Sequence, residues 1–396
     1  MQFTCSFLAL WIALFMTLAA DAAPAQVPEA VPVDGEPFPG ELAAIDAQWQ
    51  VTFQSAGTTR VLPAADLVSW GKCPEAGRRP LVVLADGGLL AADAREMDKD
   101  NLTADSDLFG PVKLPLEVVA GIVFQPPADR HRRDLLLDRI ASASGDADRL
   151  VLANDDEIVG RVQTIAKESI QVKTGVGALP VEIRRTRAIL FNPALLHRPA
   201  SKGLRAHAGF RDGSRLLATG LAVNEKSLKI TTAGGIAWTT SPQELTWLAP
   251  LGGRVTYLSD LKPDEYRYVP FLELRWPYRN DRSVTGAWLR CGGRPYLKGL
   301  GVHSAARLTY LLGEPYRRFQ AELGIDDETT GRGSVRFRVF VDGKPRYESP
   351  TVVGGQPPVP VSLDISGAKR LDLIVDYADR ADEMDHADWL NARLVR

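Results

Sequence analysis

The feature that most constrains the fold is a pattern that recurs three times in the first two thirds of the chain. Each copy consists of a strand, an acidic turn, a second strand, a variable tip, a third strand and a closing apolar strand, and the copies cover residues 82–124, 150–191 and 206–248. Residues 49–70 match the second half of the same unit. Such self-similarity is typical of small supersecondary units that stack, because each unit alone cannot bury its apolar face.

The strands of these units alternate apolar and polar residues, as at residues 170–172 and 228–230. A period of two indicates a half-buried strand. The dipeptides Asp86-Gly87 and Asp212-Gly213 supply residues that tolerate a positive φ in tight hairpins. The pattern therefore predicts repeated antiparallel sheets or barrels of about five strands each, which we assign to residues 41–250.

One helix is expected among these units, over residues 129–143. Its apolar side carries Leu135, Leu136 and Ile140, and the basic cluster at residues 130–133 is interpreted as a solvated face. Turn geometry alone accounts for the recurring aspartates of the repeats. We therefore expect the repeats to act as a spacer or as a contact surface for partner proteins.

Composition excludes several classes of protein. The 396 residues are enough for two or three domains, and 47 basic against 49 acidic residues leave a net charge of −2. This balance argues against nucleic acid as a partner. The sequence contains no HExxH, GxSxG or P-loop motif and only five histidines, so we expect no enzyme activity.

The amino terminus predicts export. Residues 7–20 form an uncharged apolar run that is too short to span a bilayer, and small residues follow it in the manner of a cleavage site. We predict a signal peptide over residues 1–23, an uncleaved anchor being the alternative, and a periplasmic or extracellular protein with no membrane span after cleavage. The Pro-rich residues 24–40 are predicted to be a flexible linker. The two cysteines that remain, Cys73 and Cys291, are expected to be free thiols.

The composition changes after residues 250–253, and many short alternating segments follow, such as residues 307–312, 319–325 and 335–341. Several antiparallel strands without a strong helix predict a jelly-roll β-sandwich over residues 251–396. The whole chain is thus predicted to be all-β, with one helix among the repeats.

Three segments of this last third, at residues 298–312, 316–344 and 361–394, contain the motifs GVH, GIDD, VDG and DHADW. In combination they closely resemble the NPCBM/NEW2 domain, a carbohydrate-binding module found beside catalytic domains of glycoside hydrolase family 98. The resemblance implies a galactose-binding-like β-sandwich that recognises glycans, with terminal galactose as the expected sugar. It does not extend to the repeats, which resemble no family that we recognise, and no glycosidase-sized barrel pattern accompanies it.

A sugar site needs an aromatic ring to stack on the apolar face of the sugar and polar groups to bind its hydroxyls. The motif DHADW supplies both kinds. We therefore expect the site to contain His303, Asp385, His386, Asp388 and Trp389, with Arg294, Tyr296 and Arg282 as further loop candidates. The alternative for Trp389 and Asp388 is a structural role, in the sandwich core and at the chain terminus.

Oxygen-rich loops at residues 326–328 and 379–388 also suit a structural Ca²⁺ ion, although the sequence does not assign its ligands. The function that these observations favour is that of an exported, non-catalytic glycan-binding protein. The alternative is an envelope scaffold or protein-interaction module in which the sugar site is unused and the repeats form the contact surface.

Overall fold

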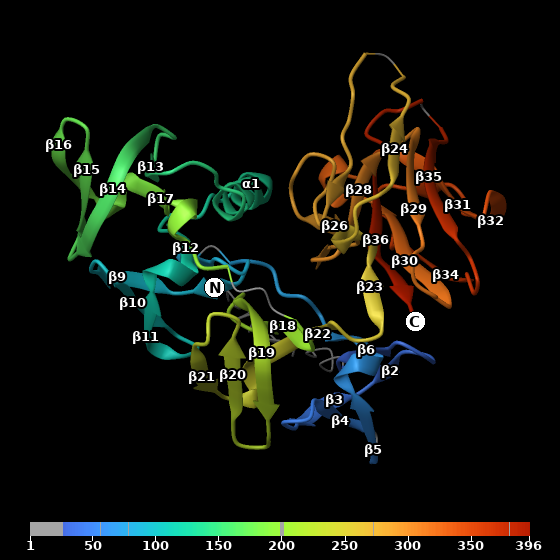
Figure 1. Ribbon diagram of the computed structural model, residues 1–396, viewed down its shortest axis with the longest axis horizontal. Helices are drawn as coiled ribbons and strands as arrows, with labels where there is room; N and C mark the ends of the chain where they lie inside the picture. The colour runs from blue at the N-terminus through green and yellow to red at the C-terminus, as the bar shows by residue number, and fades with distance from the viewer. Residues whose placement is uncertain (1–26, 56, 78, 199–201, 272, 380) are drawn as a thin grey trace, which may run out of the picture.

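The computed structural model describes residues 27–55, 57–77, 79–198, 202–271, 273–379 and 381–396. The predicted signal peptide lies outside these residues. The described chain is built from strands with one α-helix, so the all-β prediction is confirmed (Figure 1). None of the helices among the described residues is long and apolar enough to cross a membrane.

Four repeated units, rather than three and a half, form the first part of the chain. In each of them a short 3-10 turn precedes the closing strand. The first unit contains β1 (Glu29–Pro32), β2 (Phe38–Pro39), β3 (Glu41–Ile45), β4 (Gln50–Ser55), β5 (Thr58–Pro63), η1 (Ala64–Asp66) and β6 (Leu67–Gly71). The second contains β7 (Leu81–Leu84), β8 (Leu89–Ala91), β9 (Asp93–Met97), β10 (Asn101–Ser106), β11 (Gly110–Pro115), η2 (Leu116–Val118) and β12 (Val119–Val123).

The other two units follow the only α-helix of the described chain, α1 (Arg130–Ala141). The third unit contains β13 (Asp148–Leu152), β14 (Glu157–Ala166), β15 (Ser169–Thr174), β16 (Gly177–Glu182), η3 (Ile183–Arg185) and β17 (Thr186–Leu190), and η4 (Pro193–Leu195) follows it. The fourth contains β18 (Arg205–Phe210), β19 (Arg215–Val223), β20 (Leu228–Thr232), β21 (Ala237–Thr240), η5 (Pro242–Glu244) and β22 (Leu245–Leu251).

The prediction of a flexible linker over residues 24–40 is wrong for the part that the structure describes. Strand β1 pairs with β6, Ala30 lying opposite Trp70, and Val33 N donates to Asp66 O at 2.7 Å. The many prolines concealed this strand, because proline removes a hydrogen-bond donor and is tolerated mainly at the edges of sheets. Residues 29–45 therefore supply the first half of a complete unit.

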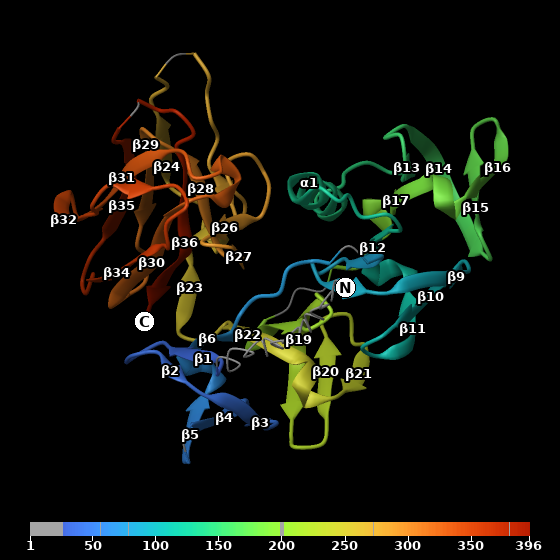
Figure 2. The same ribbon diagram turned by 180° about the vertical axis from the view of Figure 1, so that it is seen from behind.

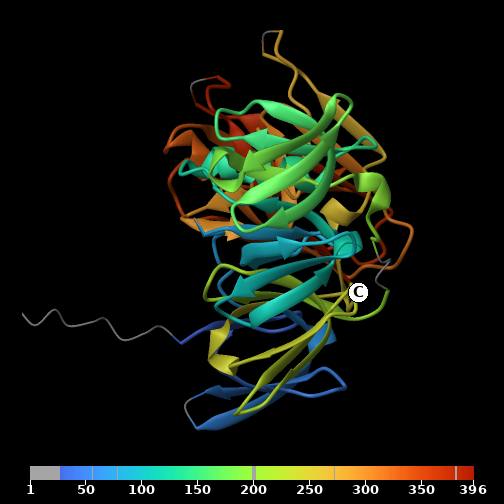
Figure 3. The same ribbon diagram turned by 90° about the vertical axis from the view of Figure 1, so that its left-hand side faces the viewer.

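The units join through their closing strands. Strand β12 pairs with β17, Ile122 lying opposite Ile189, and β6 pairs with β22, Trp70 lying opposite Leu248. The first unit is thus paired with the fourth and the second with the third, and a bridge between β8 and β19 connects the two pairs. One continuous sheet system with a shared core results, which we call the platform (residues 27–251; Figures 1 and 3).

Helix α1 packs one side on the platform and turns another toward the last third of the chain. Asp129 caps the helix by accepting from Arg132 N at 2.8 Å, and Leu136, Leu137 and Ile140 are buried. Leu135, predicted to be on the apolar side, is exposed instead. The basic cluster at residues 130–133 is not uniformly solvated, because Arg133 is buried and donates to Pro127 O.

The last third folds into two facing antiparallel sheets with a core between them, which we call the sandwich (Figure 2). One sheet contains β25 (Arg279–Asn280), β28 (Gly299–His303), β36 (His386–Val395), β30 (Arg318–Ile325) and β34 (Val359–Asp364), and β23 (Val255–Tyr257) pairs with β36. The other contains β24 (Glu265–Tyr268), β29 (Ala306–Leu311), β35 (Arg370–Tyr377), β31 (Ser334–Val341) and β32 (Lys344–Glu348), and β33 (Val352–Val353) pairs with β31. A hairpin of β26 (Leu289–Cys291) and β27 (Arg294–Tyr296) and the turns η6 (Leu258–Asp260) and η7 (Asp327–Thr329) complete it.

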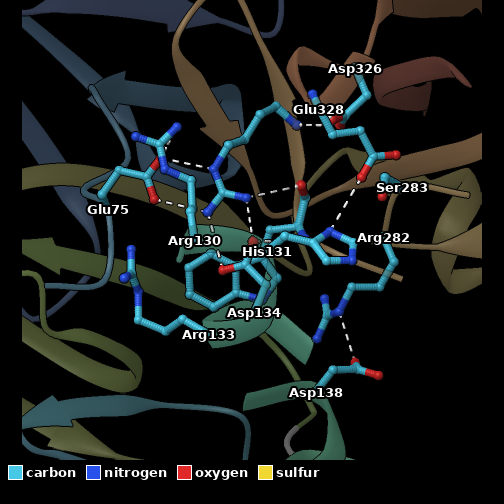
Figure 4. A network of polar contacts seen from close by, with 12 residues as sticks. Glu75, Arg130, His131, Arg133, Asp134, Asp138, Arg282, Ser283, Asp326 and Glu328 are labelled. Atoms are coloured by element: carbon cyan, nitrogen blue, oxygen red, sulfur yellow. Dashed lines mark hydrogen bonds and ion pairs between the residues drawn. The ribbon is translucent and has the colours of Figure 1, made fainter. Parts of the chain in front are cut away.

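The sandwich docks on the platform through a buried ionic contact (Figure 4). The guanidinium of Arg290 pairs with Glu75 at 2.9 Å and with Asp134 of α1, and its side chain is only 5% exposed. Burial alone lowers the pKa of Arg290, but the hydrogen bonds and charges of the two carboxylates outweigh burial and raise it. Beside this contact the guanidinium of Arg215 lies 3.6 Å from the ring centroid of Trp288.

A second contact lies where the platform begins. Asp34 pairs with Arg254 at 2.7 Å and with Arg317 at 3.2 Å, and it also pairs with Arg318. These four side chains are at least partly exposed. We therefore expect their ion pairs to contribute less to the free energy of unfolding than the buried Arg290 contact does.

We predict that replacing Asp134 with Ala lowers the free energy of unfolding of the full chain by about 3 kcal/mol, because the buried Arg290 loses a partner. Urea denaturation followed by tryptophan fluorescence measures this loss. Asp138→Ala is the matched control, since its ion pair with Arg282 is partly exposed and should contribute less than about 1 kcal/mol. Equal losses in the two variants would contradict the central role of the Arg290 contact.

Candidate functional site

Two of the predicted site residues meet at one end of the sandwich. His303 is the last residue of β28 and His386 is the first residue of β36, and the two lie directly opposite each other in the sheet. Their ring centroids are 5.8 Å apart. Both residues are largely buried, with exposed fractions of 3% for His303 and 8% for His386.

Two aromatic residues that we did not select from the sequence complete this arrangement. The ring of Trp276 stacks on His303 with centroids 5.2 Å apart and an interplanar angle of 1°, and it also lies 5.5 Å from His386. Tyr268 meets His303 edge-on at 6.3 Å. We call these four residues the imidazole–aromatic cluster. The density of aromatic residues in residues 266–278 (YRYVPFLELRWPY) was a signal that could have identified it.

The two imidazoles differ in their surroundings. Burial, and then the neighbouring His386, lower the pKa of His303 to about 4, so this ring is neutral at pH 7 and offers one donor and one acceptor. His386 Nδ1 lies 2.8 Å from Glu328 Oε1, while Glu328 Oε2 accepts from Thr285 at 2.6 Å. Burial opposes ionisation of Glu328, but the hydrogen bonds from His386 and Thr285 hold its pKa below the usual value.

Asp385, which precedes His386, fixes the backbone next to the cluster. Its side chain is fully buried and accepts from Ser334 N at 2.9 Å, which ties the segment before β36 to β31. Burial raises the pKa of Asp385 to about 6. Ala305, which follows the His303 strand, and Met384, which precedes Asp385, have φ values of 60° and 55°. Backbone in this strained region often occurs at functional sites.

Asp388 and Trp389 do not have the contacts that we expected. Trp389 is fully buried in the sandwich core, where it meets Phe337 edge-on at 4.9 Å, so no face of its ring is open to a sugar. Asp388 is also fully buried, and neither of its carboxyl oxygens has a hydrogen-bond partner among the described residues. The strand places Asp388 and Trp389 alternately on two faces, but both faces are covered. The alternative role in the sandwich core therefore describes Trp389, whereas Asp388 makes none of the hydrogen bonds that its structural alternative requires among the described residues.

The loop candidates lie away from the cluster. Tyr296 is mostly buried, and its hydroxyl donates to Glu322 Oε2 at 3.1 Å. Arg294 is exposed on β27 and has no contact with the cluster among the described interactions. Arg282 pairs with Asp138 of α1 at 2.8 Å and thus belongs to the platform contact. Cys73 and Cys291 are both free, as predicted.

The first of the two oxygen-rich loops, residues 326–328, uses its aspartates for hydrogen bonds within the protein. Asp326 accepts from the backbone N–H groups of Arg290 and Glu328, and Asp327 accepts from those of Gly292 and Gly293. Carboxylate oxygens that face hydrogen-bond donors are not arranged to coordinate a cation. Among the described residues, moreover, no group of three or more His, Cys, Asp or Glu side chains could hold a metal ion.

Comparison with known proteins assigns a family to the sandwich. Residues 254–395 match the family model described as NPCBM/NEW2 domain, and this part of the chain is such a domain. The protein of Renibacterium salmoninarum named "Putative endo-alpha-N-acetylgalactosaminidase" is 36% identical over 110 residues, which are 28% of this chain and 7% of that protein. The "Alpha-1,3-galactosidase B" of Akkermansia muciniphila is 32% identical over 117 residues, which are 28% of this chain and 15% of that protein. This chain therefore matches only a small part of either relative.

Solved structures with similarity include the CBM51 domain from Clostridium perfringens GH95 in complex with methyl-galactose. It is 26% identical, with a TM-score of 0.33, and the match covers 36% of this chain and 99% of that one. A structure of CBM51-2 in complex with GlcNAc and INT domains, from Clostridium perfringens ZmpB, is 22% identical with a TM-score of 0.34, and the match covers 57% of this chain and 43% of that one.

The buried carboxyl groups predict how stability depends on pH. Burial, and then the nearby Asp326, raise the pKa of Asp388 well above its ordinary value, and burial followed by Glu328 raises that of Asp326 to about 7. The folded state thus holds protons that the unfolded state releases. The stability that these protons contribute is fully present below the ordinary value of 3.8 and is lost as the pH rises toward 7.

We predict that Asp388→Asn makes the protein more stable than the wild type at pH 8 and flattens the decline in stability between pH 4 and pH 8. The reason is that an amide is neutral at every pH and can donate to Asp326 as a protonated carboxyl would. Urea midpoints at several pH values measure this effect. Asp107→Asn, at an exposed ion pair with Arg79, should leave the pH profile unchanged, and a profile of D388N parallel to the wild type would be the contrary result.

Proposed function

We propose that this chain is an exported, non-catalytic glycan-binding protein that recognises a terminal galactose-type sugar at the imidazole–aromatic cluster. The observation that carries the proposal is the contact of Trp276, a partly exposed indole, with two imidazoles at one end of the sandwich. An indole edge or face offers apolar surface to the C–H side of a sugar ring. The neutral ring of His303 offers the donor and the acceptor that hydroxyl groups need.

The choice of sugar rests on the relatives. The two curated relatives are named for a galactosidase and an N-acetylgalactosaminidase, and each is similar to 28% of this chain. We extend their sugar class, a galactose-type unit, to this site. Because this chain matches only a small part of each relative, the activity of the whole relatives is not carried over.

The state of the carboxyl groups supports a binding role without cleavage. Hydrolysis of a glycosidic bond generally needs two carboxyl groups that both reach the substrate. Asp385 and Asp388 are fully buried, and Glu328 is hydrogen-bonded to His386 and Thr285. Around the cluster, these carboxyl groups are thus either buried away from a ligand or, like that of Glu328, occupied by hydrogen bonds within the protein. Export is proposed from the apolar segment at residues 7–20.

A scaffold role is the second candidate, and one observation favours it. Strand β16 pairs with β15 on one side and with no other strand of the described chain, and Val176 and Leu179 at this hairpin are exposed. An open strand edge with exposed apolar side chains is a surface on which another chain can add a strand.

We predict that the full-length mature chain binds methyl β-galactoside and galactose-terminated glycans on an array. Trp276→Ala should weaken binding of the galactoside at least about tenfold, because it removes the apolar surface of the site. Isothermal titration calorimetry measures the affinity, and circular dichroism confirms that the variant is folded.

The matched control is Tyr347→Ala, which removes a half-buried aromatic residue from β32, on a hairpin of the other sheet. It should bind the galactoside as the wild type does. A folded wild-type chain that binds no glycan would reject the proposal and favour the scaffold role, for which β16 and its exposed hairpin would be the surface to examine.

A further inference from the structure

Glu328 lies between two imidazoles that come from different halves of the chain. One carboxylate oxygen is 2.8 Å from Nδ1 of His386, in the imidazole–aromatic cluster. The other is 3.5 Å from Nδ1 of His131, which belongs to helix α1 of the platform. Figure 4 shows His131 and Glu328 within the same polar network that joins the two halves. The side chain of Glu328 therefore connects His131 of the platform with His386 of the candidate sugar site.

His131 is part of a regular docking face on α1. The spacing of His131, Asp134 and Asp138, three and then four residues, places these side chains on one side of a helix. All three contact the sandwich: His131 contacts Glu328, Asp134 pairs with Arg290, and Asp138 pairs with Arg282. The helix thus presents a polar face to the sandwich, although His131 and Asp138 also remain partly exposed to solvent.

Residues 282–290 of the sandwich, which contact α1, also form hydrogen bonds with the loop of Glu328. Within residues 282–290, Arg282 and Arg290 are paired to α1. Between them Thr285 donates to Glu328 Oε2 at 2.6 Å. The backbone N–H of Arg290 donates to Asp326 at 2.9 Å, and Asp326 in turn accepts from Glu328 N at 2.9 Å. The side chain of Glu328 is therefore bonded directly to the segment that contacts α1, and its backbone is linked to the same segment through Asp326.

From this chain of contacts the geometry points to a positioning role for α1: His131 orients Glu328, and Glu328 orients the His386 ring that faces the sugar. The platform is then a part of the binding site and not a spacer. The ligand of the completed site is the galactose-type sugar of the proposed function, on which this inference rests. The coupling between His131 and His386 is a separate property that can be observed without any ligand.

The test uses the full-length mature chain and three variants of neighbouring residues. His131→Ala removes the group that contacts Glu328, and His131→Gln restores a side chain that can donate a hydrogen bond. Arg132→Ala is the control, because Arg132 is exposed on the same helix turn. Two quantities are measured at pH 7: the affinity for methyl β-galactoside, and the ring nitrogen chemical shifts of His386, whose signal is assigned by its loss in His386→Gln.

We expect His131→Ala to weaken galactoside binding about fivefold, the size of effect that loss of one ordinary polar contact produces, and to shift the His386 ring signals. His131→Gln should bind within about twofold of the wild type, and Arg132→Ala should change neither quantity. An unchanged His386 signal in His131→Ala would overturn the inference, as would an equal change in Arg132→Ala. If the wild type binds no galactoside, the proposed function fails, and the His386 signal alone decides the positioning role.

Discussion

The arrangement of this protein depends on one buried guanidinium. Arg290 lies between Asp134 of helix α1 and Glu75, and its backbone N–H donates to Asp326 next to the candidate site. A buried charge is stable only where opposite charges and hydrogen bonds replace its lost hydration. This requirement fixes the orientation of the sandwich on the platform. It also connects the contact between the halves with the loop that carries Glu328.

The candidate site illustrates how burial changes the role of ionisable residues. The motif DHADW contains two carboxyl groups that would serve as ligands for sugar hydroxyls if they were exposed. Folding instead covers both, and raises the pKa of Asp385 to about 6 and that of Asp388 well above its ordinary value. Of the cluster, the two histidines are also largely buried, while Trp276 is partly exposed. In the proposed sugar site, the polar groups that bind hydroxyls are therefore the imidazoles and not the carboxylates. His303 is neutral at pH 7 because its pKa is lowered to about 4.

Part of the fold and of the site was predictable from the sequence. The alternation of apolar residues predicted the repeats and the sandwich, and the pairing of His303 with His386 agrees with the expectation that they converge. Strand β1 was missed because its prolines are typical of linkers. Trp389 was selected because it lies inside the DHADW motif. Trp276 was missed because it reaches His303 only through a loop between β24 and β25. Proximity in the sequence could not reveal that contact.

The sequence by itself determined the all-β class and the family of the last third, because these follow from local periodicity and contiguous motifs. Tertiary structure decided which side chains are buried, which closing strands pair, and that α1 docks a polar face on the sandwich. The physical reason is that burial and charge pairing depend on neighbours that are far away in the chain. His131 and Glu328 are separated by almost two hundred residues, and no local pattern specifies their contact.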